Sequence, residues 1–172
     1  MKRPDAPPPT PSAPPQLGFL RDQSAAARLE RYLRDAIPLV NHMDVRVLSA
    51  DIRGVVLEAP LAPNRNHVGT AFGASLHGVA TLAGWGLVWL ALEEHPEREV
   101  VVAESRMRYR LPANATFQAR CALPPPESLV ELGVNYAARG RARVVLDAHI
   151  LCGGNRVAEF EGTFVAVRGK PR

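Results

Sequence analysis

The chain has 172 residues, 47% of them apolar, and a formal net charge of +4. This length suits one domain with a proper core, and the apolar content excludes a chain that is disordered throughout. A pI near 9.6 favours acidic partners, such as a phosphate-bearing cofactor or an acidic carrier protein. Aromatic residues make up only 6% of the chain and no RNA- or DNA-binding signature is found, so nucleic acid is not expected as a partner.

The two cysteines, Cys121 and Cys152, lack the CxxC spacing of metal or redox sites. We therefore expect reduced strand residues in a cytoplasmic protein, and no metal site. No apolar segment follows Lys2 and Arg3, so a secretory signal is not predicted. The apolar run over residues 82–92 is shorter than the roughly 20 residues that span a bilayer, so no membrane partner is expected.

The beginning of the chain differs in composition from the rest. Residues 1–20 hold seven of the sixteen prolines and are predicted to be a disordered tail, because proline removes backbone donors. Residues 21–169 form the predicted domain. Within it, Ser24 is a candidate N-cap of an amphipathic helix over residues 24–36, which Pro38 ends.

The middle of the chain alternates between strand and helix patterns. Residues 45–51 and 55–59 predict a β-hairpin across a turn at residues 52–54. A loop rich in Gly and Asn then leads into an apolar helix that begins at residues 73–75 and ends at residues 93–95. The three glycines inside this helix each cost about 1 kcal/mol against alanine, so it is expected to lie close against a sheet or a second helix.

Four strand-like runs follow this helix, over residues 100–111, 116–123, 141–152 and 156–167, while residues 127–138 are ambiguous. The predicted order is helix, two strands, a long buried helix and a β-meander. A single antiparallel sheet of five or six strands wrapped around one helix is an α+β hotdog fold. Another kind of α+β sandwich is the competing arrangement.

Several motifs along the chain are specific enough to compare with a known family. The longest begins at Pro60 and reads P-L-A-P-N-R-N-H-V-G-T-A-F-G-A-S-L-H-G-V-A-T-L-A-G-W-G. The shorter ones are Ile37-Pro38-Leu39, R-Y-R-L-P at 108–112, G-R-A-R at 140–143 and G-T-F-V at 162–165. These motifs resemble the putative thioesterase domain at the C-terminus of YiiD-type proteins, and the resemblance covers roughly residues 27–167.

The resemblance implies a hotdog fold in homodimers with sites at the subunit interface. Pairing of two such dimers into a tetramer is a further alternative that the sequence does not decide. It also implies acyl-thioester substrates carried on coenzyme A or on acyl carrier protein. No separate cofactor is expected, because the substrate brings its own phosphopantetheine arm. Members of this family are associated with the decarboxylation of malonyl-acyl carrier protein, which supplies acetyl starter units for fatty-acid synthesis.

The chain departs from the wider hotdog thioesterases at its reactive positions. These often read N-x-x-G-T-x-H-G-G, with a carboxylate about two turns into the helix to activate water. Here Phe72 replaces the histidine, Ala74 the second glycine and Thr81 the acid. No Asp or Glu occurs between Glu58 and Glu93. We therefore expect decarboxylation rather than hydrolysis, since a carboxylate-free site does not repel an anionic substrate.

The candidate catalytic residues lie in the loop and at the helix start. The amides of Asn64 and Asn66 are candidate donors to the substrate carbonyl or carboxylate, although asparagine also caps turns. His67 is a candidate donor or weak base, or a histidine that braces the loop. The backbone N–H groups of Gly73 and Ala74 are candidate donors of an oxyanion hole, or simply small residues at a helix start.

A second set of residues is predicted to contact the substrate: Phe72, Ser75, His77, Thr81, Arg108 and Arg141. The alternative roles are helix capping for Ser75, packing for Thr81, a satisfied core or interface histidine for His77, and a solvated sheet face for the arginines. Hydrolysis remains an alternative, with a base among Asp44, Glu58, His67 and His77. A domain that binds acyl thioesters without turning them over is a further alternative.

Overall fold

The protein is described by a computed structural model that covers Gly18, Asp22 and residues 24–169. Apart from Gly18, the tail predicted over residues 1–20 lies outside the described residues. The predicted domain is therefore represented almost completely.

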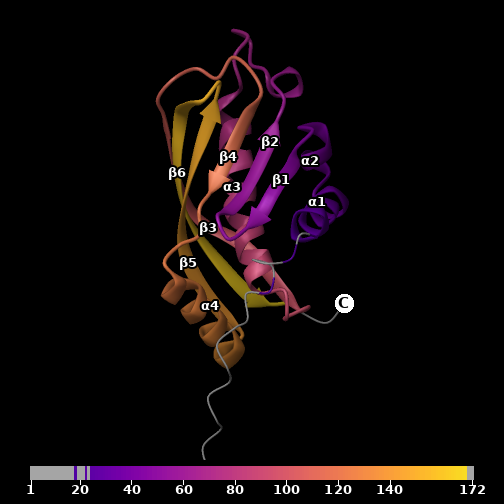
Figure 1. The fold of residues 1–172 in the computed structure, drawn as a ribbon, viewed down its shortest axis with the longest axis vertical. Coiled ribbons are helices and arrows are strands. Elements are labelled where there is room, and N and C mark those ends of the chain that lie inside the picture. The colour runs from indigo at the N-terminus through magenta and orange to yellow at the C-terminus, as the bar shows by residue number, and fades with distance from the viewer. Residues whose placement is uncertain (1–17, 19–21, 23, 170–172) are drawn as a thin grey trace, which may run out of the picture.

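Six strands form a single antiparallel sheet with the order β1-β2-β4-β5-β6-β3 (Figure 1). The strands are β1 (Arg46–Asp51), β2 (Gly54–Ala59), β3 (Arg98–Tyr109), β4 (Phe117–Cys121), β5 (Arg141–Cys152) and β6 (Asn155–Arg168). They match the predicted runs to within two residues at each end. Alternate residues of β5 are buried, so one face of the sheet covers the core and the other faces outward.

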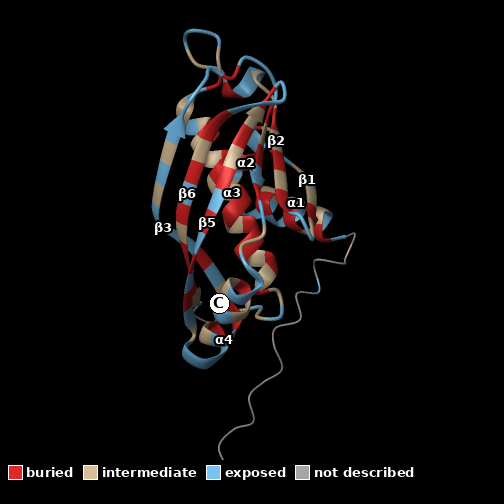
Figure 2. Ribbon diagram, turned by 60° about the vertical axis from the view of Figure 1, so that its left-hand side comes forward, coloured by how far each residue is buried: buried red, intermediate tan, exposed pale blue. Residues whose placement is uncertain are grey.

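The long helix α3 (Gly73–Ala91) lies against the concave face of this sheet and contacts five of its strands. Figure 2 shows it as the most deeply buried helix. This confirms the predicted α+β hotdog arrangement. The predicted meander holds only for β4, β5 and β6, because β3 pairs with β6 at the edge of the sheet and not with β4. By length and composition alone α3 is one helix among the described residues that could cross a membrane, but half of it is buried inside the domain, as in a core helix.

The glycines of α3 mark close contacts, as predicted from their cost in a helix. A Cβ added at Gly84 would lie 2.6 Å from the Phe164 ring in β6, and one at Gly86 would lie 2.8 Å from the Leu29 side chain. Gly78 leaves more room, with Met43 at 3.7 Å. Two of the three glycines are therefore required for the helix to approach the sheet and its neighbouring helix.

Two short helices and one longer helix complete the fold. The helix α1 (Ala25–Ala36) has the predicted bounds, and Pro38 not only ends it but begins a second helix, α2 (Pro38–His42). This second helix was not predicted; proline at a first helical position is favourable because its missing N–H has no intrahelical partner there. Ser24 stands at the predicted N-cap position of α1, but its hydroxyl donates to Asp22 (2.8 Å) and makes no capping bond to the helix.

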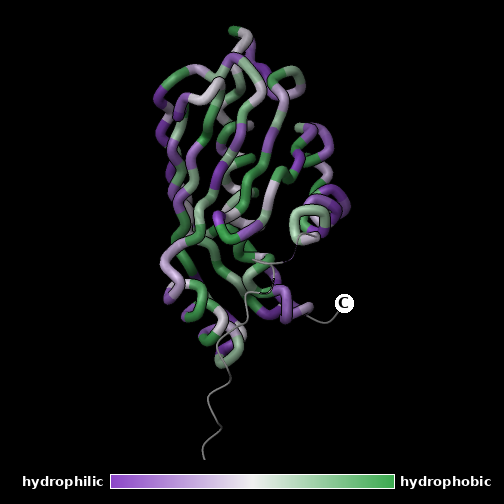
Figure 3. The backbone as a smooth tube through the Cα atoms, in the orientation of Figure 1, coloured by the Kyte–Doolittle hydropathy of each residue, from purple (hydrophilic) through white to green (hydrophobic). Residues whose placement is uncertain are grey.

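The ambiguous segment over residues 127–138 is a helix, α4 (Pro126–Arg139). Proline opens it, and Gly140 in a left-handed conformation (φ 65°) ends it. Its apolar side packs on β5 through Leu129, Leu132 and Tyr136, which are almost fully buried. In Figure 3 hydrophobic and hydrophilic segments alternate along both this helix and the strands, which is the pattern of elements with one buried side.

Candidate functional site

The first turn of α3 leaves two backbone donors without an acceptor among the described residues. Phe72 is extended, and its carbonyl accepts the N–H groups of Ser75 (2.9 Å) and Leu76 (3.1 Å). The N–H groups of Gly73 and Ala74, the first two residues of the helix, have no backbone acceptor among the described residues. Together with the dipole of a 19-residue helix, they form a site that favours developing negative charge.

A cleft of about 320 Å³ opens beside this helix start. It is lined by Ala71, Gly73, Leu76, Tyr109, Arg110, Leu111, Pro112 and Ala113. None of these is Asp or Glu, as the sequence predicts for the loop and helix. The Tyr109 hydroxyl donates to the Gly73 carbonyl (3.0 Å), so the last residue of β3 holds the helix start in place. The Arg110 guanidinium is bound to Glu159 (2.9 Å), so its charge is paired with a carboxylate.

Asn64 is buried and directs its donors inward. It is 2% exposed, and its side-chain N–H groups donate to the carbonyls of Met43 (2.9 Å) and Pro60 (2.8 Å). Its own carbonyl accepts the N–H of Phe72 (2.7 Å). Asn64 therefore connects the end of α2, the end of β2 and the start of α3, and its side-chain amide donates to these two carbonyls. Its Oδ1 is buried and has no partner among the described residues.

The loop between Asn64 and α3 is braced by Asn66. Its Oδ1 accepts the N–H groups of Val68 (3.0 Å) and Thr70 (3.2 Å), and its amide donates to the Thr70 hydroxyl (3.0 Å). His67 is exposed at the tip of this loop. The geometry places both asparagines as supports of the loop, while their predicted contacts with substrate, and that of His67, stay predictions.

The predicted substrate contacts on α3 lie around the same end of the helix. Phe72 is 55% exposed beside the two free N–H groups, and Ser75 is half-buried. The His77 Nε2 lies 2.9 Å from the Ser105 Oγ of β3, and the His77 ring packs against Phe160. Thr81, at the position where the related enzymes carry an acid, follows His77 one turn later and is also half-buried.

The two predicted arginines, Arg108 and Arg141, line separate clefts. Arg106 and Arg108 line a cleft of about 200 Å³ together with Asp147, Glu159 and Glu161, so carboxylates accompany these cations. Arg139, Arg141 and Arg143 line a larger cleft of about 610 Å³ whose carboxylates are Glu104 and Glu131. The second cleft therefore keeps an excess of positive charge.

The two cysteines do not line the α3 cleft. Both cysteines are free and buried in strands, as predicted, and burial raises the pKa of Cys121 to about 12, so it is not a thiolate at neutral pH. Within the described part of the chain, no three His, Cys, Asp or Glu side chains gather as metal ligands.

Tyr109 and Ser105 are the contacts that sequence reasoning missed. Both lie on the face of β3 that turns toward α3, together with Met107. The alternation of β3 does predict that Met107 and Tyr109 share a face, and extending it two residues back would have included Ser105. Their contacts with α3 could not be predicted, because these depend on how the helix crosses the sheet.

Comparison with known proteins identifies the family. A family model described as putative thioesterase (yiiD_Cterm) matches residues 26–168. The chain belongs to this family. The match covers the whole sheet and α3, including the cleft at the helix start, so this thioesterase family supplies the fold in which the site is built.

Solved structures agree with this family assignment. A protein of unknown function from Chlorobaculum tepidum TLS has 29% identity and a TM-score of 0.80, over 84% of this chain and 94% of that chain. A putative thioesterase from Shewanella oneidensis has 29% identity and a TM-score of 0.74, over 84% and 98%. A protein of unknown function from Pseudomonas aeruginosa, described as a probable thioesterase, has 25% identity and a TM-score of 0.70, over 83% and 95%.

Proposed function

We propose that this protein is an enzyme of acyl-thioester metabolism that decarboxylates malonyl-acyl carrier protein to acetyl-acyl carrier protein, for the initiation of fatty-acid synthesis in the cytoplasm. The observation that carries the proposal is the cleft at the start of α3, which has no lining carboxylate and lies beside two backbone N–H groups that have no acceptor among the described residues. No separate cofactor is proposed, because the substrate carries its phosphopantetheine arm.

The chemistry requires stabilisation of charge and no base. When the malonyl carboxylate leaves as CO₂, the electron pair of the broken C–C bond moves onto the thioester oxygen as an enolate, which then takes a proton from solvent. The N–H groups of Gly73 and Ala74 would donate to that oxygen. A single preorganised donor of this kind is typically worth about 3 kcal/mol of transition-state stabilisation.

Hydrolysis of acyl thioesters is the second candidate, because the family is described as a thioesterase. It needs a nucleophile that the related enzymes generate with a carboxylate, and Thr81 stands at that position. Among the bases considered from the sequence, Glu58 accepts from Gln118 (2.9 Å) and Asp44 lies 3.6 Å from Arg34, so both are held in polar contacts away from the cleft. His67 and His77 remain the candidates.

A homodimer formed through β3 is part of the proposal. This strand is an edge of the sheet, and most of its residues are exposed, including the apolar Val101 and Val102. An exposed edge strand with apolar side chains is a template for pairing with another strand. Because β3 also carries Tyr109 beside Gly73, a second copy on this edge would border the cleft and exclude water from it.

The carrier of the acyl group is proposed to bind at the larger arginine cleft. Arg141 and its neighbours Arg139 and Arg143 offer planar donors that suit phosphate or carboxylate groups. Exchange of Arg141 for Glu should weaken binding of the carrier about tenfold or more at low salt and flatten its salt dependence. The same exchange at Arg106, whose cleft already holds carboxylates, is the control and should have a smaller effect.

The reaction itself is tested by incubating the purified protein with malonyl-acyl carrier protein and identifying the carrier-bound product by mass spectrometry. Acetyl-acyl carrier protein together with CO₂ supports decarboxylation. Free malonate and a free carrier thiol would instead establish hydrolysis, and unchanged substrate that remains bound would establish a binding protein without turnover.

A matched pair of variants tests the backbone donor. Gly73→Pro removes one N–H at the first helical position, and Phe72 before it already has the extended conformation that proline requires (ψ 133°). Gly73→Ala adds a Cβ against the Tyr109 ring at the same 3.3 Å but keeps the N–H. Decarboxylation should fall about 100-fold in the proline variant and much less in the alanine variant. Equal activity of the two variants would contradict the oxyanion role of Gly73.

A further inference from the structure

We propose that Ser105 and His77 form a nucleophile–base pair that gives the protein a hydrolytic activity, through an acyl-serine intermediate, toward thioesters without a β-carboxylate. The proposal goes beyond decarboxylation and rests on the proposed function in one respect, namely that thioesters reach the start of α3. Its basis is the distance of 2.9 Å between the Ser105 Oγ and the His77 Nε2.

The pair is accessible and supported on two rigid elements. Both side chains are half-buried, so they are neither sealed in the core nor free on the surface. His77 comes from α3, where its ring packs against Phe160 (5.5 Å between centroids), and Ser105 comes from β3. A serine oxygen within hydrogen-bonding distance of an oriented imidazole is the geometry that activates a serine nucleophile.

The pair also lies on the same face of α3 as the free donors. His77 follows Gly73 by four residues and Ala74 by three, which places the three residues on one side of the helix. Long side chains in helices lean toward the N-terminus, so the imidazole extends toward the first turn. Tyr109, two positions beyond Met107 on the same face of β3 as Ser105, reaches Gly73 itself.

The proposed reaction balances without any group beyond water. The Ser105 oxygen attacks the thioester carbonyl, His77 takes the hydroxyl proton, and the N–H groups of the α3 start receive the negative charge of the tetrahedral intermediate. The carbon–sulfur bond breaks, the thiolate leaves with the proton from His77, and an acyl ester on Ser105 remains. Water, deprotonated by His77, then attacks the ester, which releases the acid and restores the serine hydroxyl.

Related hydrolases carry a carboxylate base at the position of Thr81, and in this chain His77 would act as the base instead. His77 precedes Thr81 by one turn on α3, so the base would enter from nearly the same side of the helix. Malonyl thioesters would still decarboxylate, because that reaction uses the backbone donors without a nucleophile. Acyl groups without a carboxylate to lose, such as acetyl, would pass to Ser105 instead.

The test measures thiol release from acetyl-coenzyme A and, separately, CO₂ release from malonyl-acyl carrier protein. Ser105→Ala and His77→Gln should each lower kcat for thiol release about 100-fold or more, while decarboxylation stays within about threefold for Ser105→Ala. Ser49→Ala, a half-buried serine on β1 at the other side of the sheet, is the matched control and should change neither rate. Thermal unfolding of each variant verifies that it is folded.

Labelling provides a second readout. A fluorophosphonate probe should attach to Ser105, as identified by peptide mass spectrometry, and the attachment should disappear in His77→Gln. Thiol release that persists in folded Ser105→Ala, or a probe that leaves Ser105 unlabelled, overturns the proposal. Thiol release without any acetyl-acyl carrier protein from malonyl-acyl carrier protein would overturn the decarboxylase assignment while leaving the serine pair intact.

Discussion

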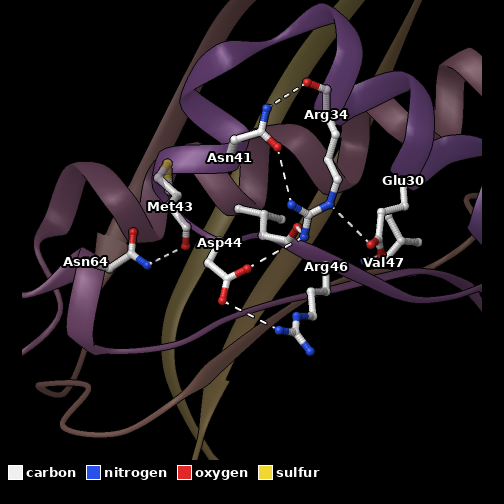
Figure 4. A network of polar contacts seen from close by, with 9 residues as sticks. Glu30, Arg34, Asn41, Met43, Asp44, Arg46, Val47 and Asn64 are labelled. Carbon is white, nitrogen blue, oxygen red and sulfur yellow. Dashed lines mark hydrogen bonds and ion pairs between the residues drawn. The ribbon is translucent and has the colours of Figure 1, made fainter.

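The two edge strands of the sheet, β1 and β3, differ in whether their outer backbone groups are covered. At β1 they are covered, and this edge is called the closed edge. Helix α1 lies along it and supplies side chains to its backbone (Figure 4). The Glu30 carboxylate accepts the N–H of Val47 (2.8 Å), and the Arg34 guanidinium donates to the carbonyl of Val45 (3.1 Å). Arg34 is itself bound to Glu30 (3.3 Å). Charged side chains thus take the places that a neighbouring strand would occupy.

The other edge, β3, is largely open. In an antiparallel strand, alternate residues direct their backbone N–H and C=O groups away from the neighbouring strand. The N–H of Arg110 donates to Val157 of β6 (2.8 Å), so the backbone groups of Ser105, Met107 and Tyr109 point away from β6. Near the start of the strand, the Trp85 indole donates to the carbonyl of Val100 (2.7 Å). The open part therefore begins beyond Val100 and runs beside His77 and the cleft.

The two edges of the sheet have different roles: β1 contributes to stability, and β3 borders the candidate site. The closed edge uses buried and charge-assisted hydrogen bonds that hold α1 and α2 to the sheet. The open edge keeps its backbone groups, its half-buried Ser105 and the start of α3 accessible. Substitutions at the closed edge should therefore affect folding, and substitutions at the open edge should affect assembly and activity.

The largest effect on stability is expected at Asn64, on the closed side. Asn64→Ala leaves the carbonyls of Met43 and Pro60 without their donors in a buried place, which should lower the free energy of unfolding by about 2 to 4 kcal/mol. Asn66→Ala, in the exposed loop, is the control and should cost about 1 kcal/mol. Chemical denaturation followed by fluorescence measures both. Similar losses for the two variants would show that burial of Asn64 does not matter.

The hydrogen bonds of Asn64 also show which features of the fold could be predicted from the sequence and which could not. The positions of α1, α3 and the six strands, the glycine contacts of α3 and the carboxylate-free loop follow from local patterns, because period and turn chemistry act over a few residues. The helices α2 and α4 were not predicted in this way. The role of Asn64 does not, since Met43 is 21 residues away and is brought close only by α2. A buried asparagine that supports the loop and an exposed one that meets a substrate look the same in a sequence.

The second prediction concerns the open edge. Val102→Lys places a charge on an exposed β3 residue and should weaken the proposed homodimer tenfold or more, which is about 1.4 kcal/mol or more. Leu48→Lys, on the closed strand β1 and 47% exposed, is the matched control and should leave assembly unchanged. Analytical ultracentrifugation over a range of concentrations measures the dissociation constants. A dimer lost only in the Leu48 variant would place the interface at β1 and contradict the proposed β3 interface.

The third prediction weakens the closed edge directly. Arg34→Ala removes the donor to Val45 and the ion pair with Glu30, and should destabilise the protein by about 1 kcal/mol because these groups are only partly buried. Arg31→Ala, an exposed neighbour on α1, should have little effect. Denaturation gives the stability, and light scattering shows whether the uncovered β1 edge now associates. No difference between the variants would mean that packing of α1 alone closes this edge.

The smallest effect is expected in the middle of the sheet, where pH should act without involving either edge. The pKa of His149 on β5 lies below its usual value, first because burial disfavours the charged ring and then because Arg156 and Arg120 repel it. Glu159, opposite His149, is occupied by Arg110. In the unfolded chain the pKa returns to about 6.5. As the pH falls below that value, the unfolded state therefore binds a proton that the folded state does not, and the free energy of unfolding decreases.

The loss should stay below about 1 kcal/mol, since His149 is only partly buried and solvent screens its neighbours. Denaturation of wild type and His149→Gln between about pH 7.5 and pH 5 measures it, because other titrating groups cancel in the difference between the two proteins. The wild type should lose more stability than the variant on acidification, with no change in assembly. If the dimer dissociated over this pH range in the wild type but not in His149→Gln, protonation of His149 would affect assembly at β3, and the middle of the sheet would not be independent of its open edge.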